Sequence, residues 1–176
     1  PGQGGSRARM KRAIALAVLA LLAGCSGTPT SPRGSDGQVL SPTHLPVTGL
    51  EVGDCVGPLV DGDIAKVEVI PCVSPHYWEA YNKKYMTGGD YPGDEVVATE
   101  AKDYCTAEYI PYVGAEYGHS NLVIKYFAPN EQTWKQGDRE IVCLVGTETG
   151  GLTGTVKGSE LESAPGTESP SDTPTP

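Results

Sequence analysis

Cys25 is the residue of this chain whose surroundings point most clearly to a covalent reaction. It follows a basic start, Met10-Lys11-Arg12, an apolar run over 13–23 and the small residue Gly24. A positively charged start, a short apolar run and small residues before a cleavage point are features of a secretory signal peptide. The apolar run is far shorter than the roughly 20 residues that a membrane-spanning helix needs. Residues 10–24 are therefore predicted to be a signal peptide that is removed before Cys25.

The last five residues of this segment make the prediction more specific. Leu21-Leu22-Ala23-Gly24-Cys25 resembles the bacterial lipobox, in which the cysteine thiol receives a diacylglyceryl group and becomes the mature N-terminus. The resemblance implies that Cys25 is lipidated and that the chain is anchored to the extracytoplasmic face of the cell membrane.

The other four cysteines are expected to form disulfides, because an even number of cysteines in an exported domain usually does so. They are Cys55, Cys72, Cys105 and Cys143. No two of them form a CxxC pair and no histidine stands at zinc-finger spacing, which argues against a zinc site. Four cysteines allow three pairings. We favour Cys55 with Cys72 and Cys105 with Cys143, which follow chain order and close loops of modest size.

The net charge of the chain limits which kinds of partner it is expected to bind. Four cations, Arg7, Arg9, Lys11 and Arg12, leave with the signal segment, and the net charge changes from −9 to −13. An acidic surface repels nucleic-acid phosphates and anionic lipid headgroups. Nucleic acid is therefore not an expected partner, and membrane attachment has to come from the lipid anchor.

Composition divides the mature chain into three parts. Residues 25–48 comprise the lipidated cysteine and a segment rich in Ser, Thr, Pro and Gly, which predicts a flexible tether. Residues 49–158 are expected to form one domain of near-average size. Residues 159–176 are again rich in Ser, Thr and Pro, and we expect this tail to be disordered.

The domain is expected to be an α+β fold in which one main helix covers a small antiparallel sheet. Short β-branched stretches predict strands at 51–56, 64–70, 122–128 and 140–145, the first two as an antiparallel pair. The segment 77–86 is ambiguous between helix and strand. The helix is predicted from Asp94 to Ile110, with one apolar face and Pro111 at its end. A Cys105–Cys143 bridge would join this helix to the last strand.

Seven short motifs occur in one order along the predicted domain. They are Gly53-Asp54-Cys55, Val69-Ile70-Pro71-Cys72 with Pro75-His76, Tyr91-Pro92-Gly93, Tyr112-Val113-Gly114, Pro129 with Trp134, Gly137-Asp138-Arg139 with Cys143, and the run 152–159. Together they resemble the septum-formation family domain of actinobacterial exported and membrane-anchored proteins. The resemblance implies a role in the cell envelope, linked to septum formation or wall assembly.

His76 and Glu79 are the residues that most invite an acid–base or metal-binding interpretation. A metal site needs three or four converging ligands, and these two residues do not supply them. The alternative is that His76 packs at a turn or strand edge near the Cys72 bridge. No phosphate-binding loop, dinucleotide fingerprint, calcium loop or HExxH motif is present. We therefore predict no catalytic residue, no metal and no cofactor.

Tyrosine and tryptophan outnumber phenylalanine eleven to one, and such rings are enriched at binding surfaces. Tyr77, Trp78, Tyr81 and Tyr85 fall in one segment and are the predicted partner-binding residues. On a regular strand the three tyrosines would share one face, opposite Trp78. The alternative is that these rings complete the core.

The expected function is that of a lipid-anchored, non-catalytic binding module of the cell envelope. Its partner would be another envelope protein. The alternatives are a module that binds wall glycan and an enzyme that acts on wall glycan or peptide.

Overall fold

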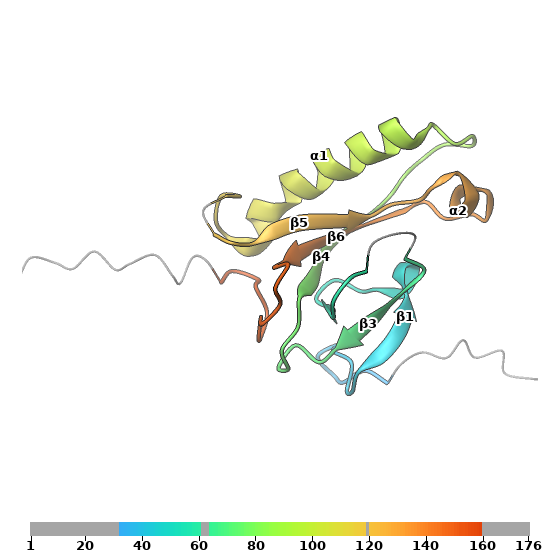
Figure 1. Ribbon diagram of the computed structural model, residues 1–176. Coiled ribbons are helices and arrows are strands. Elements are labelled where there is room, and N and C mark those ends of the chain that lie inside the picture. Colours follow the sequence, from blue (N-terminus) through green and yellow to red (C-terminus); the bar gives the residue numbers. More distant parts are fainter. Residues whose placement is uncertain (1–31, 61–63, 119, 160–176) are drawn as a thin grey trace, which may run out of the picture. The chain divides into compact units, whose positions relative to one another are not determined.

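Six strands form one curled antiparallel sheet in the computed structural model, which describes residues 32–60, 64–118 and 120–159 (Figure 1). The spatial order of the strands is β1-β3-β2-β4-β6-β5, and each neighbouring pair is antiparallel. Their bounds are β1 Thr43–Pro46, β2 Cys55–Val56, β3 Lys66–Ile70, β4 Trp78–Tyr85, β5 Val123–Phe127 and β6 Glu140–Gly146. A short 3-10 helix, η1, spans Val47–Gly49, and two α-helices, α1 and α2, span Asp94–Val113 and Glu131–Lys135. The predicted α+β class is confirmed.

The sheet has a hydrophobic core on each face, and β6 contributes to both. Ile141, Cys143 and Val145 of β6 pack toward α1, whereas Val142 and Leu144 pack on the opposite face. The core beneath α1 also contains Tyr81, Tyr109 and Trp134, among others. The opposite core contains Leu50, Val56, Val69 and Trp78, among others. All seven residues of β6 are buried, which is why its sequence is nearly continuously apolar rather than alternating.

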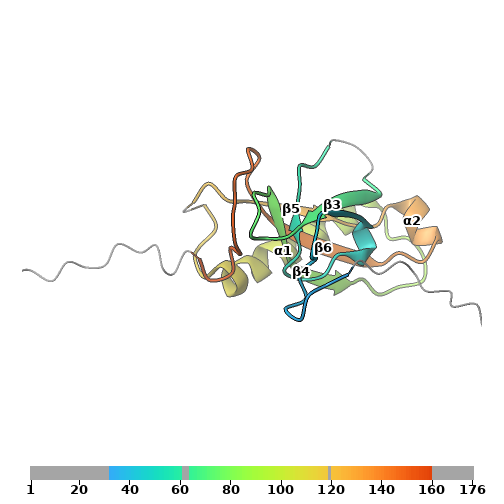
Figure 2. The same cartoon turned by 90° about the horizontal axis from the view of Figure 1, so that it is seen from below.

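Helix α1 lies along the sheet beside β5 and β6, and the views from the front and from below agree on this (Figures 1 and 2). Figure 2 also shows the C-terminal segment after β6 at one end of the sheet and α2 at the other. Asp94 and Glu95 occupy the first turn of α1, where their charge stabilises the helix N-terminus. None of the helices in the described ranges combines the length and apolar character needed to cross a membrane.

The predicted end of the helix at Pro111 is wrong. Pro111 lies inside α1, and the helix closes only at Gly114, whose left-handed backbone (φ 90°) lets its N–H bond to the carbonyl of Ile110. Val113 is fully buried and continues the four-residue spacing that ends in Cys105 and Tyr109. Burial of this last apolar position outweighs the loss of one backbone hydrogen bond at the proline.

The predicted tether over 25–48 is corrected at its C-terminal end. Thr43–Pro46 forms β1 and pairs with β3, and Leu45 of this strand is buried in the core opposite α1. The composition of this segment is typical of a linker, but burial of Val39 and Leu45 and pairing with β3 order its C-terminal part. The predicted antiparallel pair over 51–56 and 64–70 is confirmed, with β2 and β3 shorter than expected.

The ambiguous segment 77–86 forms β4, and an irregularity changes which way its rings point. The pairing of β4 with β6 shifts register between Ala80 and Asn82, so Tyr81 is the additional residue of a β-bulge. Tyr81 lies in the core beneath α1, and Asn82 also faces α1, where it bonds to Glu108. The alternation is thereby reversed, and Tyr85 does not share the face of Tyr81. The expectation of one face for Tyr77, Tyr81 and Tyr85 is wrong.

Candidate functional site

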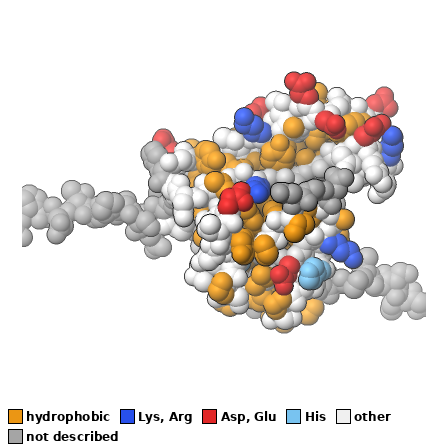
Figure 3. Space-filling view, in the orientation of Figure 1, with side chains coloured by type: hydrophobic (Ala, Val, Ile, Leu, Met, Phe, Trp, Pro, Cys, Tyr) orange, Lys and Arg blue, Asp and Glu red, His pale blue; other side chains and the backbone are white. Residues whose placement is uncertain are grey.

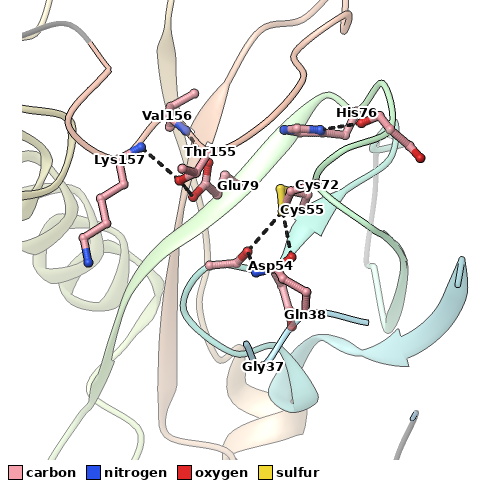
Figure 4. The surroundings of a disulfide bond; sticks show 12 residues. Gly37, Gln38, Asp54, Cys55, Cys72, His76, Glu79, Thr155, Val156 and Lys157 are labelled. Atoms are coloured by element: carbon pink, nitrogen blue, oxygen red, sulfur yellow. Dashed lines mark hydrogen bonds between the residues drawn. A yellow bond between two sulfur atoms is a disulfide. The ribbon is translucent and has the colours of Figure 1, made fainter. Parts of the chain in front are cut away.

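Two parts of the described chain could support a function: a buried polar junction around Glu79 and an open groove beside β5. The junction lies where β4, β2 and the C-terminal segment meet, next to the Cys55–Cys72 disulfide (Figure 4). The groove lies on the sheet face opposite α1, between the end of β5 and η1. Cys25, the predicted lipidation site, lies outside the described residues.

Glu79 is a fully buried carboxylate on β4 that is surrounded by hydrogen-bond donors. Tyr112 of α1 donates its hydroxyl to Oε1 at 2.6 Å, and Thr155 donates to the same oxygen at 2.5 Å. The backbone N–H of Val156 donates to Oε2 at 2.7 Å. Burial and the bond to Glu79 raise the pKa of Tyr112 well above its usual value, so the phenol stays protonated and keeps donating. Glu79 therefore holds the end of α1 and the C-terminal segment to the sheet.

His76 lies two residues before β4 and is also fully buried. Its backbone pairs with Leu152 through two hydrogen bonds of 2.9 and 3.1 Å. Its ring Nδ1 lies 2.9 Å from the carbonyl oxygen of Ser74, which can only accept, so Nδ1 carries the proton. Nε2 then presents a lone pair, and it has no hydrogen-bond partner among the described residues. The prediction that His76 packs at a strand edge near the Cys72 bridge is confirmed.

The two disulfides pair as predicted, Cys55 with Cys72 and Cys105 with Cys143. The second bridge joins α1 to β6, which the sequence also predicted. A ligand atom from each of Cys55, His76 and Glu79 lies within 4.8 Å of the other two. With Cys55 oxidised, only the histidine nitrogen and the carboxylate can act as ligands, which is fewer than a zinc site requires.

Asp54 forms a second buried polar contact, which sequence reasoning missed. The guanidinium of Arg33 donates two hydrogen bonds to its carboxylate, at 2.5 and 2.9 Å, and the N–H of Glu51 donates a third at 2.8 Å. The hydrogen bond to Asp54 raises the pKa of Arg33 above its ordinary value. The contact attaches residues N-terminal to β1 to the turn before β2. An isolated arginine in a segment of otherwise small and polar residues was the only available signal.

The predicted aromatic surface does not form. Trp78 and Tyr81 are each only 1% exposed, and Tyr77 packs against the core opposite α1. Tyr85 is 69% exposed and is the most accessible of the four, and Tyr77 is half-buried. The prediction is therefore wrong for Trp78 and Tyr81. The alternative, in which these rings complete the core, describes them correctly.

The open groove has a volume of about 870 Å³ and is lined mainly by apolar and uncharged polar residues, with Asp138 and Glu140 also at its wall. Among the lining residues are Tyr126, Phe127, Asn130, Gln132, Thr133 and Gln136. Rings with nearby amides and hydroxyls can stack on and hydrogen-bond to a polar, uncharged ligand. Sequence reasoning missed this groove because its walls come from β5, α2 and η1, which are distant along the chain.

The outer face of α1 has a different character. Figure 3 shows acidic side chains gathered over the helix at the top of the molecule. Asp94, Glu95, Glu100, Asp103 and Glu108 are exposed or half-buried there, with Lys102 among them. A shallower groove of about 590 Å³ lies on this side, between α1 and Lys84 of β4. This face repels anions, whereas the groove beside β5 is less charged.

Comparison with known proteins gives one family and two curated relatives. A family model described as septum formation matches residues 52–167. The chain is 25% identical over 163 residues to LppN of Mycobacterium tuberculosis, a protein named as a candidate lipoprotein. The match covers 78% of this chain and 90% of that protein. LppN of Mycobacterium bovis matches with the same identity and coverage. No solved structure matches.

Proposed function

The chain belongs to the septum formation family, and from this premise we propose that it is a lipid-anchored, extracytoplasmic binding module of the cell envelope. Its lipid is carried by Cys25, and it performs no catalysis. The folded domain binds another envelope protein through the groove beside β5 and acts in septum formation or wall assembly.

The sequence around Cys25 and the comparisons support the anchor. The basic start, short apolar run and lipobox-like end at Cys25 are those of a lipoprotein signal. LppN, which matches over 90% of its own length, is itself named as a candidate lipoprotein. The net charge of −13 after processing repels anionic headgroups, so the acyl chains have to supply the attachment.

The observation that supports a binding role is that the buried carboxylates are engaged by partners within the protein. The carboxylates of Asp54, Glu79 and Glu140 are each within hydrogen-bonding or ion-pairing distance of internal partners, in the last case Lys83 Nζ at 2.7 Å. Asp54 and Glu79 are at most 1% exposed and lie away from the groove, and Glu140, which borders the groove, is 4% exposed and paired with Lys83. A general acid or base must reach the proton that it transfers. The accessible groove offers apolar surface, amides and hydroxyls beside the carboxylate of Asp138, which suit recognition.

A second candidate ligand is wall glycan, and the groove lining favours it. Phe127 lines the groove together with Asn130, Gln132 and Gln136. Sugars are commonly bound by stacking on rings and by hydrogen bonds to amide groups.

Site-specific photo-cross-linking in native cells tests the proposal. A photoreactive residue replaces the exposed Gln132 in the groove, and a matched control replaces the exposed Lys102 on the outer face of α1. We expect a discrete protein adduct from position 132 and none from position 102, with the adduct reduced at least about tenfold by Phe127→Ala. Equal cross-linking at both positions would contradict the proposal. Sedimentation of the purified domain with wall polymer, in the absence of any partner protein, would identify glycan as the ligand.

A further inference from the structure

The buried imidazole of His76 is arranged as a metal-binding histidine is. Metal-ligating histidines usually donate one ring N–H to a carbonyl or carboxylate and direct the other nitrogen at the metal. Here Nδ1 donates to the Ser74 carbonyl oxygen at 2.9 Å, and the fully buried Nε2 has no hydrogen-bond partner among the described residues. Figure 4 shows the imidazole of His76 extending toward the side on which Glu79 and the disulfide lie. A buried acceptor without a donor is costly to maintain, so its orientation needs an explanation.

Three other ligands converge on the same place. A carboxylate oxygen of Glu79, Cys55 Sγ and a ring nitrogen of His76 lie within 4.8 Å of one another, and Cys72 Sγ is bonded to Cys55 Sγ. Donors to both oxygens orient Glu79, two on Oε1 and one on Oε2. Oε2 therefore retains a lone pair for a further bond.

The sulfur of Cys72 has surroundings that suit a thiol. It lies 2.9 Å from Gln38 Oε1 and 3.3 Å from the Gly53 carbonyl oxygen, two acceptors to which a disulfide sulfur has no proton to donate. Cys72 is 9% exposed, whereas Cys55, Cys105 and Cys143 are completely buried. A reductant can therefore approach this bridge more readily than the one beneath α1.

We propose that reduction of the Cys55–Cys72 disulfide converts this junction into a zinc(II) site, with both thiolates, His76 Nε2 and a Glu79 oxygen as ligands. Two sulfurs, one imidazole nitrogen and one carboxylate oxygen form a tetrahedral set that suits zinc. This inference is independent of the groove and of the proposed binding function.

The reaction requires a dithiol reductant. Its thiolate attacks a sulfur of the bridge, a mixed disulfide forms, and its second thiol releases the protein thiol as the reductant closes to a disulfide. Two electrons and two protons pass to Cys55 and Cys72. Zinc then displaces both thiol protons to solvent as it binds.

Cobalt(II) titration of the full chain tests the site, because thiolate-bound cobalt absorbs in the near ultraviolet. All samples carry Cys25→Ala to remove the competing thiol, and a phosphine replaces the dithiol, taking up the oxygen of one water as it reduces the bridge. We expect one equivalent of cobalt to bind the reduced protein with a thiolate charge-transfer band that zinc abolishes. The oxidised protein should show no such band.

Variants decide which residues hold the metal. His76→Gln should weaken cobalt binding at least about tenfold, and Cys55→Ser with Cys72→Ser should remove the band. His44→Gln, at an exposed position of β1, is the matched control and should bind as the unmodified chain does. Circular dichroism of the same samples reports folding. Absence of the band in the reduced protein, folded or unfolded, or unchanged affinity in His76→Gln, would overturn the proposal.

Discussion

The two ends of the sheet are held together by different kinds of interaction. Beneath α1, a twenty-residue helix packs on β4, β6 and β5 over a core that includes Tyr81, Tyr109 and Trp134. At the other end, β1, β3 and β2 have four, five and two residues and supply less apolar surface. There the Arg33–Asp54 ion pair and the Cys55–Cys72 bridge add to the packing. Where strands are short, covalent and ionic contacts compensate for the small core.

Removal of either disulfide is expected to have the largest effect on stability and to show the difference between the two ends of the sheet. Cys105→Ala with Cys143→Ala opens a loop with a sequence separation of 38, and Cys55→Ala with Cys72→Ala opens one of 17. The chain-entropy relation gives losses in the free energy of unfolding of about 4 and about 3 kcal/mol, respectively. Denaturant titration measures both losses.

Hydrogen exchange shows where each loss acts. Without Cys55–Cys72, amides of β1, β2 and β3 should exchange faster while those of α1 remain protected. Without Cys105–Cys143, protection should fall throughout the domain. Equal loss of protection in both regions for both variants would contradict the distinction between the two ends.

Glu79→Ala should have the next largest effect, because it leaves the hydroxyl of Tyr112 and the N–H of Val156 without their acceptor. We expect a loss of about 3 kcal/mol in the free energy of unfolding. Glu79→Gln is the control: its carbonyl oxygen can still accept from Val156, and the hydroxyls of Tyr112 and Thr155 can turn to accept from its NH₂ group. A loss of about 1 kcal/mol is expected there. Equal losses in both variants would show that the hydrogen bonds are not what stabilises this junction.

Arg33→Ala should have a smaller effect that is confined to the short-strand end. It leaves Asp54 buried without its cation, but the Arg33 side chain is 20% exposed, so solvent moderates the cost. We expect a loss of about 2 kcal/mol in the free energy of unfolding, and partial recovery in Arg33→Lys. Urea titration measures the loss. An unchanged midpoint of unfolding would show that the ion pair does not stabilise the domain.

The architecture could be predicted from the sequence more accurately than the direction of individual side chains. The spacing of Val97, Ala101, Cys105 and Tyr109 identified the apolar face of α1, and chain order identified the disulfide pairs. Nothing local revealed that Val113 extends the helix beyond Pro111, because its burial depends on distant residues. The bulge at Tyr81 was equally invisible, since it arises from how β4 meets β6.

The candidate sites, too, were only partly predictable from the sequence. His76 and Glu79 could be singled out from residue type and spacing, but their proximity to Cys55 depends on the pairing of β2 with β4. The groove beside β5 combines residues whose separation in the chain exceeds any motif. Phe127 lies in an ordinary strand sequence, and only the fold shows that it borders this groove.

Mass spectrometry of the intact protein from its native cells tests the central claim, an anchored domain with oxidised cysteines outside the cytoplasm. The account predicts an N-terminus at Cys25 with a diacylglyceryl group, and Cys105 bonded to Cys143 in every molecule. An unprocessed N-terminus, or free thiols at Cys105 and Cys143, would contradict it.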